Sequence, residues 1–365
     1  MDTTDPEIVF DEKGVCNHCL TNDRLKEMLP STKEQSDKML ADAIGQIKAY
    51  GKNKPYDCLM GLSGGVDSSY LAYLAKQHGL RPLVVHFDNG WNSELAVSNI
   101  RNIVTKLDFD LQTYVIDWEE FKDLQRSFLL SGVLDLELLS DQAIISTIFK
   151  LAKENNIKYI LSGCNIATET HLPSSWNWMK YDAKNIRSIQ KIYGTKKIKS
   201  FPLMGVFEYT LRQTLYKYKF VRLLDMAQFN KNEALELLQS EFGWREYGTK
   251  HGESIITKFY QNYILPHKFG IDKRRAHLSS MLCSGHITRD EALAEIEKPL
   301  YSPEELEIDI DYVAKKLDFS RKELDDILNA PAKSHLDYPS EYNRYTFVRW
   351  LKYKVYGERV AGLAS

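Results

Sequence analysis

Short apolar runs alternate with stretches of helical periodicity over the first half of the chain. The apolar runs have the length and composition of buried strands. The stretches between them, such as 93–107 and 141–154, repeat their apolar positions as amphipathic helices do. Strands that alternate with helices predict a parallel sheet covered by helices on both faces. The predicted strands are residues 56–62, 80–87, 109–116 and 157–163.

A helix is predicted before the first strand, over residues 31–51, with Gly51 at its end. After about residue 225 the strand pattern fades and the remainder is helical. Two pairs there, Thr288 with Glu291 and Ser320 with Glu323, have the spacing of a capping box, so we interpret them as structural. Three regions are expected: an irregular cysteine-containing knuckle (1–30), an α/β domain (31–225) and a helical C-terminal domain (226–365).

Composition excludes few functions, but it indicates the cellular location and the redox state of the cysteines. The 365-residue chain has a net charge of −2, which gives no bulk electrostatic attraction to nucleic acid or to an anionic membrane, although local patches could still bind either. No apolar stretch approaches the roughly 20 residues that a membrane-spanning helix needs. With an acidic start and five cysteines that form no disulfide framework, we expect a cytoplasmic protein with reduced thiols.

The stretch LSGGVDSSYL connects the first predicted strand to a helix and concentrates small and polar residues at the helix N-terminus. Free backbone N–H groups there favour an anion, and Gly64 and Gly65 allow close backbone approach. Asp67 would repel a bare phosphate, so it indicates a shared cation, most simply Mg²⁺ on a polyphosphate. A glycine turn followed by a helix cap would explain the glycines and one hydroxyl, but not the whole set.

The string SGGVDSS at residues 63–69 resembles the PP-loop of the N-type ATP pyrophosphatases. The resemblance implies a Rossmann-like parallel sheet, binding of ATP with Mg²⁺, and activation of a carbonyl oxygen with AMP as pyrophosphate leaves. Two further segments follow the second and fourth predicted strands, where that fold meets the nucleotide. The expected nucleotide-binding residues are Ser63, Gly64, Gly65, Val66, Asp67, Ser68, Ser69, His86, Phe87, Asp88, Gly163, Asn165 and Thr168.

Residues 1–19 and 247–293 resemble the N-acetyl sugar amidotransferases of bacterial surface-polysaccharide synthesis. This resemblance implies that an acetamido group becomes an acetamidino group, with ammonia from a separate glutaminase and a cyclase-like subunit similar to imidazole glycerol phosphate synthase. A nucleotide-linked diacetamido uronic acid and a nonulosonic acid both fit as the sugar. None of the cysteines is a convincing glutaminase nucleophile in this chain.

Several cations lie in the second of these segments: Lys250, His251, Lys273, Arg274 and Arg275. They could bind ATP phosphates or an anionic sugar nucleotide, and a solvated basic surface is the alternative. Together with Asp67, we predict Lys250 and Arg274 as catalytic residues.

Cys16 and Cys19 have the spacing of half a tetrahedral zinc site, after a turn that Gly14 permits. The related family has a further C-x-x-C just upstream of the residue numbered Met1 here. Either the true start lies upstream, or zinc is absent or is completed by other ligands such as His18. Two free thiols in a turn are an equally good interpretation.

Two other functions remain open. A tRNA-modifying member of the same superfamily would also need the PP-loop, and the basic segment 195–200 could contact phosphates. The near-neutral charge and the absence of a catalytic cysteine pair argue against a nucleic-acid partner. A noncatalytic nucleotide-binding scaffold subunit is the third possibility.

Overall fold

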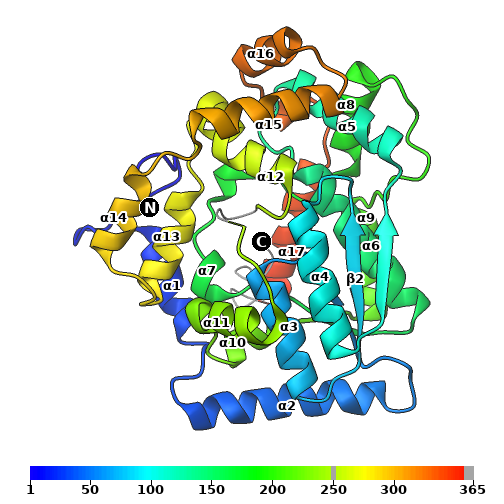
Figure 1. The fold of residues 1–365 in the computed structure, drawn as a ribbon, viewed down its shortest axis with the longest axis vertical. Helices are drawn as coiled ribbons and strands as arrows, with labels where there is room; N and C mark the ends of the chain where they lie inside the picture. Colours follow the sequence, from blue (N-terminus) through cyan, green and yellow to red (C-terminus); the bar gives the residue numbers. More distant parts are fainter. Residues whose placement is uncertain (248–251, 357–365) are drawn as a thin grey trace.

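The computed structural model describes residues 1–247 and 252–356, and at its centre is a five-stranded parallel sheet (Figure 1). The strand order is β3-β2-β1-β4-β5, so the chain changes direction across the sheet at β1. The carboxyl ends of β1 and β4 therefore border the position where open α/β sheets bind their ligands. The strands are β1 (Cys58–Gly61), β2 (Pro82–Asp88), β3 (Leu111–Val115), β4 (Tyr159–Leu161) and β5 (Lys219–Val221).

The predicted α/β fold is confirmed, and each of the four predicted strands is present. β5 was not predicted, because it has only three residues, lies at the sheet edge and is mostly exposed. So short an edge strand leaves no recognisable apolar pattern.

Helices cover both faces of the sheet. Alternate residues of β1 point to opposite faces, with Met60 in one buried cluster and Leu59 in another. The Met60 cluster includes Ile47 and Leu71 from the helices on its face, and the Leu59 cluster includes Phe149. The first face is covered by α2 (Lys33–Gly51), α3 (Val66–Gln77), α4 (Glu94–Leu107), α10 (Leu223–Met226) and α11 (Lys231–Phe242), and the second by α6 (Leu138–Glu154) and α9 (Val206–Tyr216).

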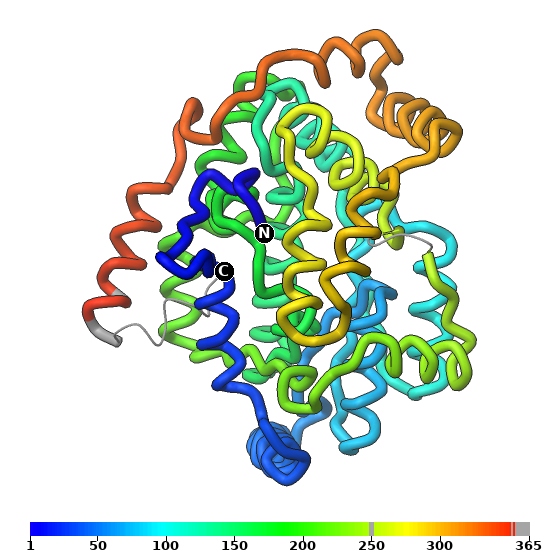
Figure 2. Tube along the Cα trace, turned by 90° about the vertical axis from the view of Figure 1, so that its left-hand side faces the viewer, coloured from blue at the N-terminus to red at the C-terminus, as the bar shows by residue number. Residues whose placement is uncertain are grey.

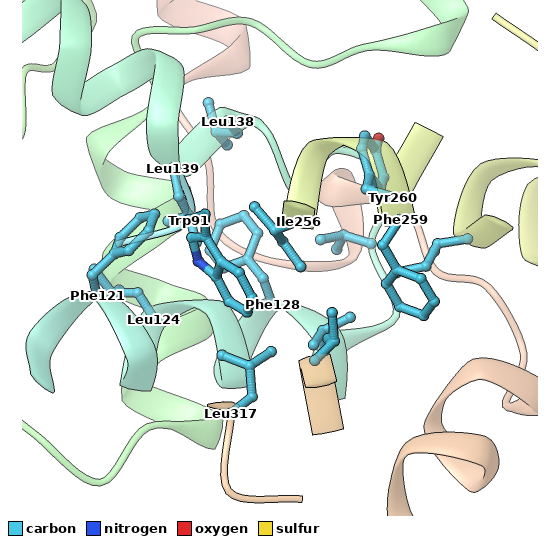
Figure 3. Close-up of a cluster of buried hydrophobic side chains, with 14 of the residues drawn as sticks. Trp91, Phe121, Leu124, Phe128, Leu138, Leu139, Ile256, Phe259, Tyr260 and Leu317 are labelled. Carbon is cyan, nitrogen blue, oxygen red and sulfur yellow. The ribbon is translucent and has the colours of Figure 1, made fainter. Parts of the chain in front are cut away.

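A third buried cluster joins the C-terminal helices to the α/β domain (Figure 3). Trp91, Phe121 and Phe128 from the α/β domain pack with Ile256 and Phe259. The contributing helices are α5 (Trp118–Ser131), α8 (Ala183–Tyr193), α12 (Ile255–Phe259), the π-helix η2 (Tyr260–Phe269), α13 (Arg274–Cys283), α15 (Pro303–Lys316) and α16 (Arg321–Asn329). The remaining elements are α1 (Asn17–Lys26), α7 (Ile166–Glu169), η1 (Ser174–Trp176), α14 (Arg289–Glu297), η3 (His335–Asp337) and α17 (Tyr342–Tyr356).

The packing does not break at the expected domain boundary near residue 225. Helix α11 lies against α3 and α4, and Leu238 and Phe242 belong to the same buried cluster as Met60. The division into three domains stays a prediction, with α10 and α11 packed as part of the sheet layers.

None of the described helices is long and apolar enough to cross a membrane.

Residues 1–30 contain a helix, α1, which the sequence did not indicate because its apolar positions have no periodicity. This region lies against α7 and α13 (Figure 2). Asp5 forms an ion pair with His18 at 2.6 Å, and Asp2 forms one with Arg275.

The two predicted capping boxes, which start at Thr288 and Ser320, are both confirmed.

The basic segment 195–200 is held by carboxylates of α5. Glu120 accepts hydrogen bonds from three consecutive backbone N–H groups, and Asp123 accepts two more. The Lys196 ammonium pairs with Glu119, so part of the segment's positive charge is neutralised within the chain. The backbone donors to Glu120 are Lys199, Ser200 and Phe201.

We predict that Glu120→Gln destabilises the protein by about 2 kcal/mol near neutral pH, since it weakens hydrogen bonds to a buried carboxylate. Burial alone would raise the pKa of Glu120, but the backbone donors hold it below its usual value. The stabilisation is therefore complete above the unfolded pKa of about 4.3 and is lost as the pH falls through the lower folded pKa. Urea unfolding from pH 3 to 7 should show the two proteins converging at acid pH. The exposed neighbour variant Glu119→Gln should unfold almost as the wild type does.

Candidate functional site

The predicted loop lies where β1 ends and α3 begins. Gly65 is the N-cap of α3 and offers no capping side chain, so the first N–H groups of this 12-residue helix have no side-chain acceptor from the cap. The positive end of the helix thus faces the switch point of the sheet. This geometry fits a phosphate group, as predicted.

Hydrogen bonds within the loop fix its shape. The Ser63 and Ser68 hydroxyls lie 3.1 Å apart, and the Gly65 N–H donates to Ser63 Oγ. Ser68 Oγ also lies 3.2 Å from the Gly65 carbonyl oxygen. Ser69 differs from the other loop serines: its side chain is fully buried and its hydroxyl has no hydrogen-bond partner in the part of the chain that the structure describes, so its contact with phosphate stays a prediction.

Gly64 occupies the one position in this loop that excludes other residues. Its φ of +89° is in the left-handed region. A Cβ there would lie 3.0 Å from the Tyr247 hydroxyl and 3.1 Å from the Ala96 carbonyl oxygen. The Gly64 carbonyl oxygen accepts hydrogen bonds from Trp244 Nε1 and the Tyr247 hydroxyl, both at 2.8 Å. Sequence reasoning missed these two aromatic residues, because nothing in their own segment indicates contact with a loop 180 residues earlier.

The loop after β4 lies directly against the PP-loop. A Cβ on Gly163 would lie 3.6 Å from the Ser68 nitrogen, and Asn165 Nδ2 lies 3.4 Å from Asp67 Oδ2. Asn165 Oδ1 in turn caps α7 by accepting from the Thr168 N–H and hydroxyl. The structure therefore brings these predicted residues together, with Asp67 oriented by an amide.

The loop after β2 is tied to the same place. His86 is buried, with Nδ1 3.0 Å from the Leu62 carbonyl oxygen and Nε2 3.0 Å from Asn92 Nδ2. Asn92 also donates to Asp88 Oδ1. His86 thus holds the loop through both ring nitrogens, and its contact with the nucleotide stays a prediction. Phe87 stacks on Tyr114, with ring centroids 5.6 Å apart.

Lys250 and His251 lie outside the described residues, so the role predicted for Lys250 stays a prediction. Residues on either side of them are at the loop. Tyr247 contacts Gly64, and the Glu253 carbonyl oxygen accepts from the Ser93 N–H at 2.9 Å.

The other predicted cations have partners within the chain. Lys273 pairs with Glu137 at 2.8 Å, and Arg275 pairs with Asp2. Arg274 forms a forked ion pair with Asp272 and donates to three carbonyl oxygens near the end of α14. A solvated basic surface is thereby ruled out for Arg274. Its geometry is that of a residue that joins α13 to α14, and a catalytic role for it stays a prediction.

The two N-terminal cysteines lie together but do not complete a zinc site. Cys16 and Cys19 Sγ atoms are 3.5 Å apart, and Gly14 has the positive φ expected for the preceding turn. His18, the predicted extra ligand, pairs with Asp5 instead. Within residues 1–247 and 252–356, no group of three or more His, Cys, Asp or Glu side chains is arranged to hold a metal ion. These residues do not fit zinc in this conformation.

The Cys58 thiol near the site is not activated, because its complete burial raises its pKa. Cys164 is exposed on the loop after β4. The pKa of Cys19 is also raised to about 11, first by burial and then by Cys16. A nucleophilic cysteine needs the opposite shift.

A cluster of charged side chains that the sequence did not reveal lies around the start of α6. Lys180 Nζ lies 2.6 Å from the buried Asp135 carboxylate and 3.0 Å from Asp141. The Asp141 side chain is 39% exposed, so it is the accessible carboxylate of the two. The adjacent Glu137–Lys273 pair makes the group a cluster of three carboxylates and two ammonium groups.

Two protein families match different parts of the chain. Residues 57–170 match the queuosine biosynthesis protein QueC, and residues 253–352 match the C-terminal domain of LPS biosynthesis proteins similar to WbpG. The predicted resemblances are confirmed. The first match contains the PP-loop and the strands around it, and the second contains α12 to α16, so the chain joins a QueC-like PP-loop region to a WbpG-like C-terminal region.

Among solved structures, the chain is similar to an NH3-dependent NAD synthetase from Campylobacter jejuni in complex with nitrate, with 14% identity, 56% of this chain and 84% of the other covered, and a TM-score of 0.30. It is also similar to a protein described as a predicted subunit of tRNA methyltransferase from Methanocaldococcus jannaschii, with 15% identity, 50% and 74% covered, and a TM-score of 0.28. No curated protein matches the chain.

We predict that Gly64→Ala weakens ATP binding at least about tenfold and destabilises the protein by about 1–3 kcal/mol, since it combines a strained φ with two close contacts. Gly61→Ala is the matched control, because a Cβ there meets nothing within 4 Å. Calorimetric titration with Mg-ATP and urea unfolding measure the two effects. Wild-type affinity and stability in Gly64→Ala would show that this loop conformation is not required.

Proposed function

We propose that the protein is an ATP-dependent, AMP-forming amidotransferase that converts an acetamido group of an N-acetylated sugar into an acetamidino group, for LPS or a related surface glycan. The observation that carries this proposal is the contact between the PP-loop and residues near the WbpG-like region. Tyr247 donates to Gly64, and His277 Nδ1 lies 2.9 Å from the carbonyl oxygen of Thr168 in the β4 loop. The part that suits ATP and the part shared with LPS proteins thus meet at one site.

The amide oxygen of the sugar is a poor leaving group, so the reaction must first activate it. The amide oxygen of the sugar attacks the α-phosphorus of ATP, which forms an O-adenylyl imidate and releases pyrophosphate. Ammonia then attacks the imidate carbon, and AMP leaves with the original amide oxygen. Such a reaction depends mainly on charge neutralisation and on alignment of the reactants.

The chain's residues supply both requirements. The N–H groups at the start of α3 and the Ser63 and Ser68 hydroxyls bind phosphate oxygens, and Asp67, oriented by Asn165, would hold Mg²⁺. Magnesium would neutralise the pyrophosphate as it leaves. Lys250, located in the sequence between Tyr247 and Glu253, is proposed to contact the same phosphates.

Ammonia is proposed to come from partner subunits that resemble the glutaminase and cyclase of imidazole glycerol phosphate synthase. The complete burial of Cys58, which raises its pKa, supports an external source, since a glutaminase nucleophile is a readily ionised thiol. Cytoplasmic location is part of the same proposal.

The test of this function is pyrophosphate release from Mg-ATP and ammonia with different acceptors. We expect release with a UDP-linked diacetamido uronic acid or with a nonulosonic acid, and none with bulk tRNA. Asp67→Ala should reduce the rate by at least about 100-fold, because it removes the proposed magnesium ligand.

Asp57→Ala is not a suitable control, since Asp57 forms a buried ion pair with Arg81. Asp42→Ala is better, because Asp42 is exposed on α2, and it should react as the wild type does. Release with tRNA alone would identify a tRNA-modifying enzyme. Tight ATP binding without release for any acceptor would identify a scaffold subunit.

We further propose that the charged cluster around Asp141 and Lys180 binds the hydroxyl groups of the acceptor. Asp141→Asn should raise the KM for the sugar by about 10- to 100-fold, the value of hydrogen bonds to a charged group, and should leave the KM for ATP within about twofold. The control is Asp42→Asn. Steady-state rates at varied sugar and ATP separate the two constants, and an equal rise in both would place Asp141 outside the acceptor site.

A further inference from the structure

The last helix of the described chain, α17, exposes large apolar side chains to solvent. Phe347 is 60% exposed and Trp350 is 53% exposed, and their rings stack on each other with centroids 6.0 Å apart. Leu351 and Tyr353 are exposed as well. Four large apolar residues left in water on one helix are more than a surface helix normally carries, and such groupings mark interaction sites.

These side chains form a face and are not scattered. The helix contacts the protein through Tyr345 and Val348, which are half-buried. A helix turns 100° per residue, so Trp350 lies about 140–200° around the axis from those two positions. Phe347 and Tyr353 are three residues to either side of it and share its face. Figure 2 shows α17 at the outer edge of the molecule.

The charged residues of α17 are all basic. The segment YNRYTFVRWLKYKVY carries four basic residues and no acidic one. Arg344 pairs with Glu341 at 3.2 Å, whereas Arg349 and Lys354 form no ion pair with any residue of the described ranges. The basic residues are Arg344, Arg349, Lys352 and Lys354. The chain as a whole has a net charge of −2, so the positive charge of α17 is a local feature. A local concentration of charge of one sign is typical of an interaction site.

The neighbouring helix α9 has exposed apolar side chains of its own. Helix α9 contacts α17, and the Val206 N–H at its start donates to Glu341. On α9, Phe207 is 73% exposed, and Leu211 and Leu215 follow at steps of four residues. Residues four apart share one face of a helix, so α9 also presents an apolar stripe to solvent.

We infer that the face made by Phe347, Trp350, Leu351 and Tyr353 of α17, with the stripe on α9, docks the protein on an anionic membrane surface. Aromatic rings with an apolar body and a polar edge, flanked by Arg and Lys, match the boundary between acyl chains and anionic headgroups. A second copy of the chain is a poor occupant, because the two-fold contact would oppose two positive helices. This inference does not depend on the proposed reaction.

The test is co-sedimentation of the full chain with vesicles of phosphatidylglycerol or of phosphatidylcholine, at low and at high salt. We expect binding to phosphatidylglycerol at least about tenfold tighter than to phosphatidylcholine, and weaker at high salt. The double variant Arg349→Glu with Lys354→Glu should lose at least about tenfold in affinity, since each cation near an anionic surface contributes substantially.

The apolar part is tested separately with Phe347→Ser and Trp350→Ser. Both residues are exposed, so their replacement should leave the unfolding midpoint unchanged while it weakens vesicle binding. Ile308→Ser is the matched control, because Ile308 is equally exposed on α15, far along the chain from α17, and should bind as the wild type does. Absence of vesicle binding, or equal binding to both lipids, would overturn the inference. Loss of a dimer in Trp350→Ser, without vesicle binding, would identify a protein interface instead.

Discussion

The conformation of the PP-loop depends on the hydrogen bonds that the carbonyl oxygen of Gly64 accepts. This oxygen accepts two hydrogen bonds, from Trp244 and from Tyr247, and so the left-handed turn of the PP-loop is held from outside the loop. Hydrogen bonds within the loop, such as that from the Gly65 N–H to Ser63 Oγ, fix its local shape. The Gly64 carbonyl group anchors the loop to the rest of the protein. Because the two donors belong to the segment after α11, correct placement of the loop requires the chain to be folded beyond the sheet.

Two other contacts join the regions that the family comparisons assign separately. The region similar to QueC contains the PP-loop, strands β1 to β4 and helix α3. The region similar to WbpG-like proteins begins at residue 253, next to Ser93 in the loop after β2, and its helix α13 reaches the loop after β4 through His277. An acceptor held by the second region would therefore lie beside a nucleotide held by the first. This arrangement is what an adenylylation reaction requires.

Sequence alone predicted the parts of this design that depend on local pattern. The strands around residues 56–62 and 80–87, the two capping boxes and the loop at 63–69 all follow from short-range periodicity and from a distinctive string of residues. It did not predict that Ser69 is buried, because its neighbours in the string are equally polar and only the packing of α3 distinguishes them. Nor did it predict Trp244 or the Asp141–Lys180 pair. Each of these depends on residues that are far apart in the chain, and a single sequence does not record which distant residues meet.

The central claim is that the sugar's amide oxygen becomes an oxygen of AMP. Its most direct test uses an acceptor with ¹⁸O in the acetamido group, together with Mg-ATP and ammonia, and mass analysis of the AMP that is released. The account predicts one ¹⁸O atom in the phosphate of AMP for each acetamidine formed. Unlabelled AMP, with the ¹⁸O retained in the sugar or lost to water, would contradict it.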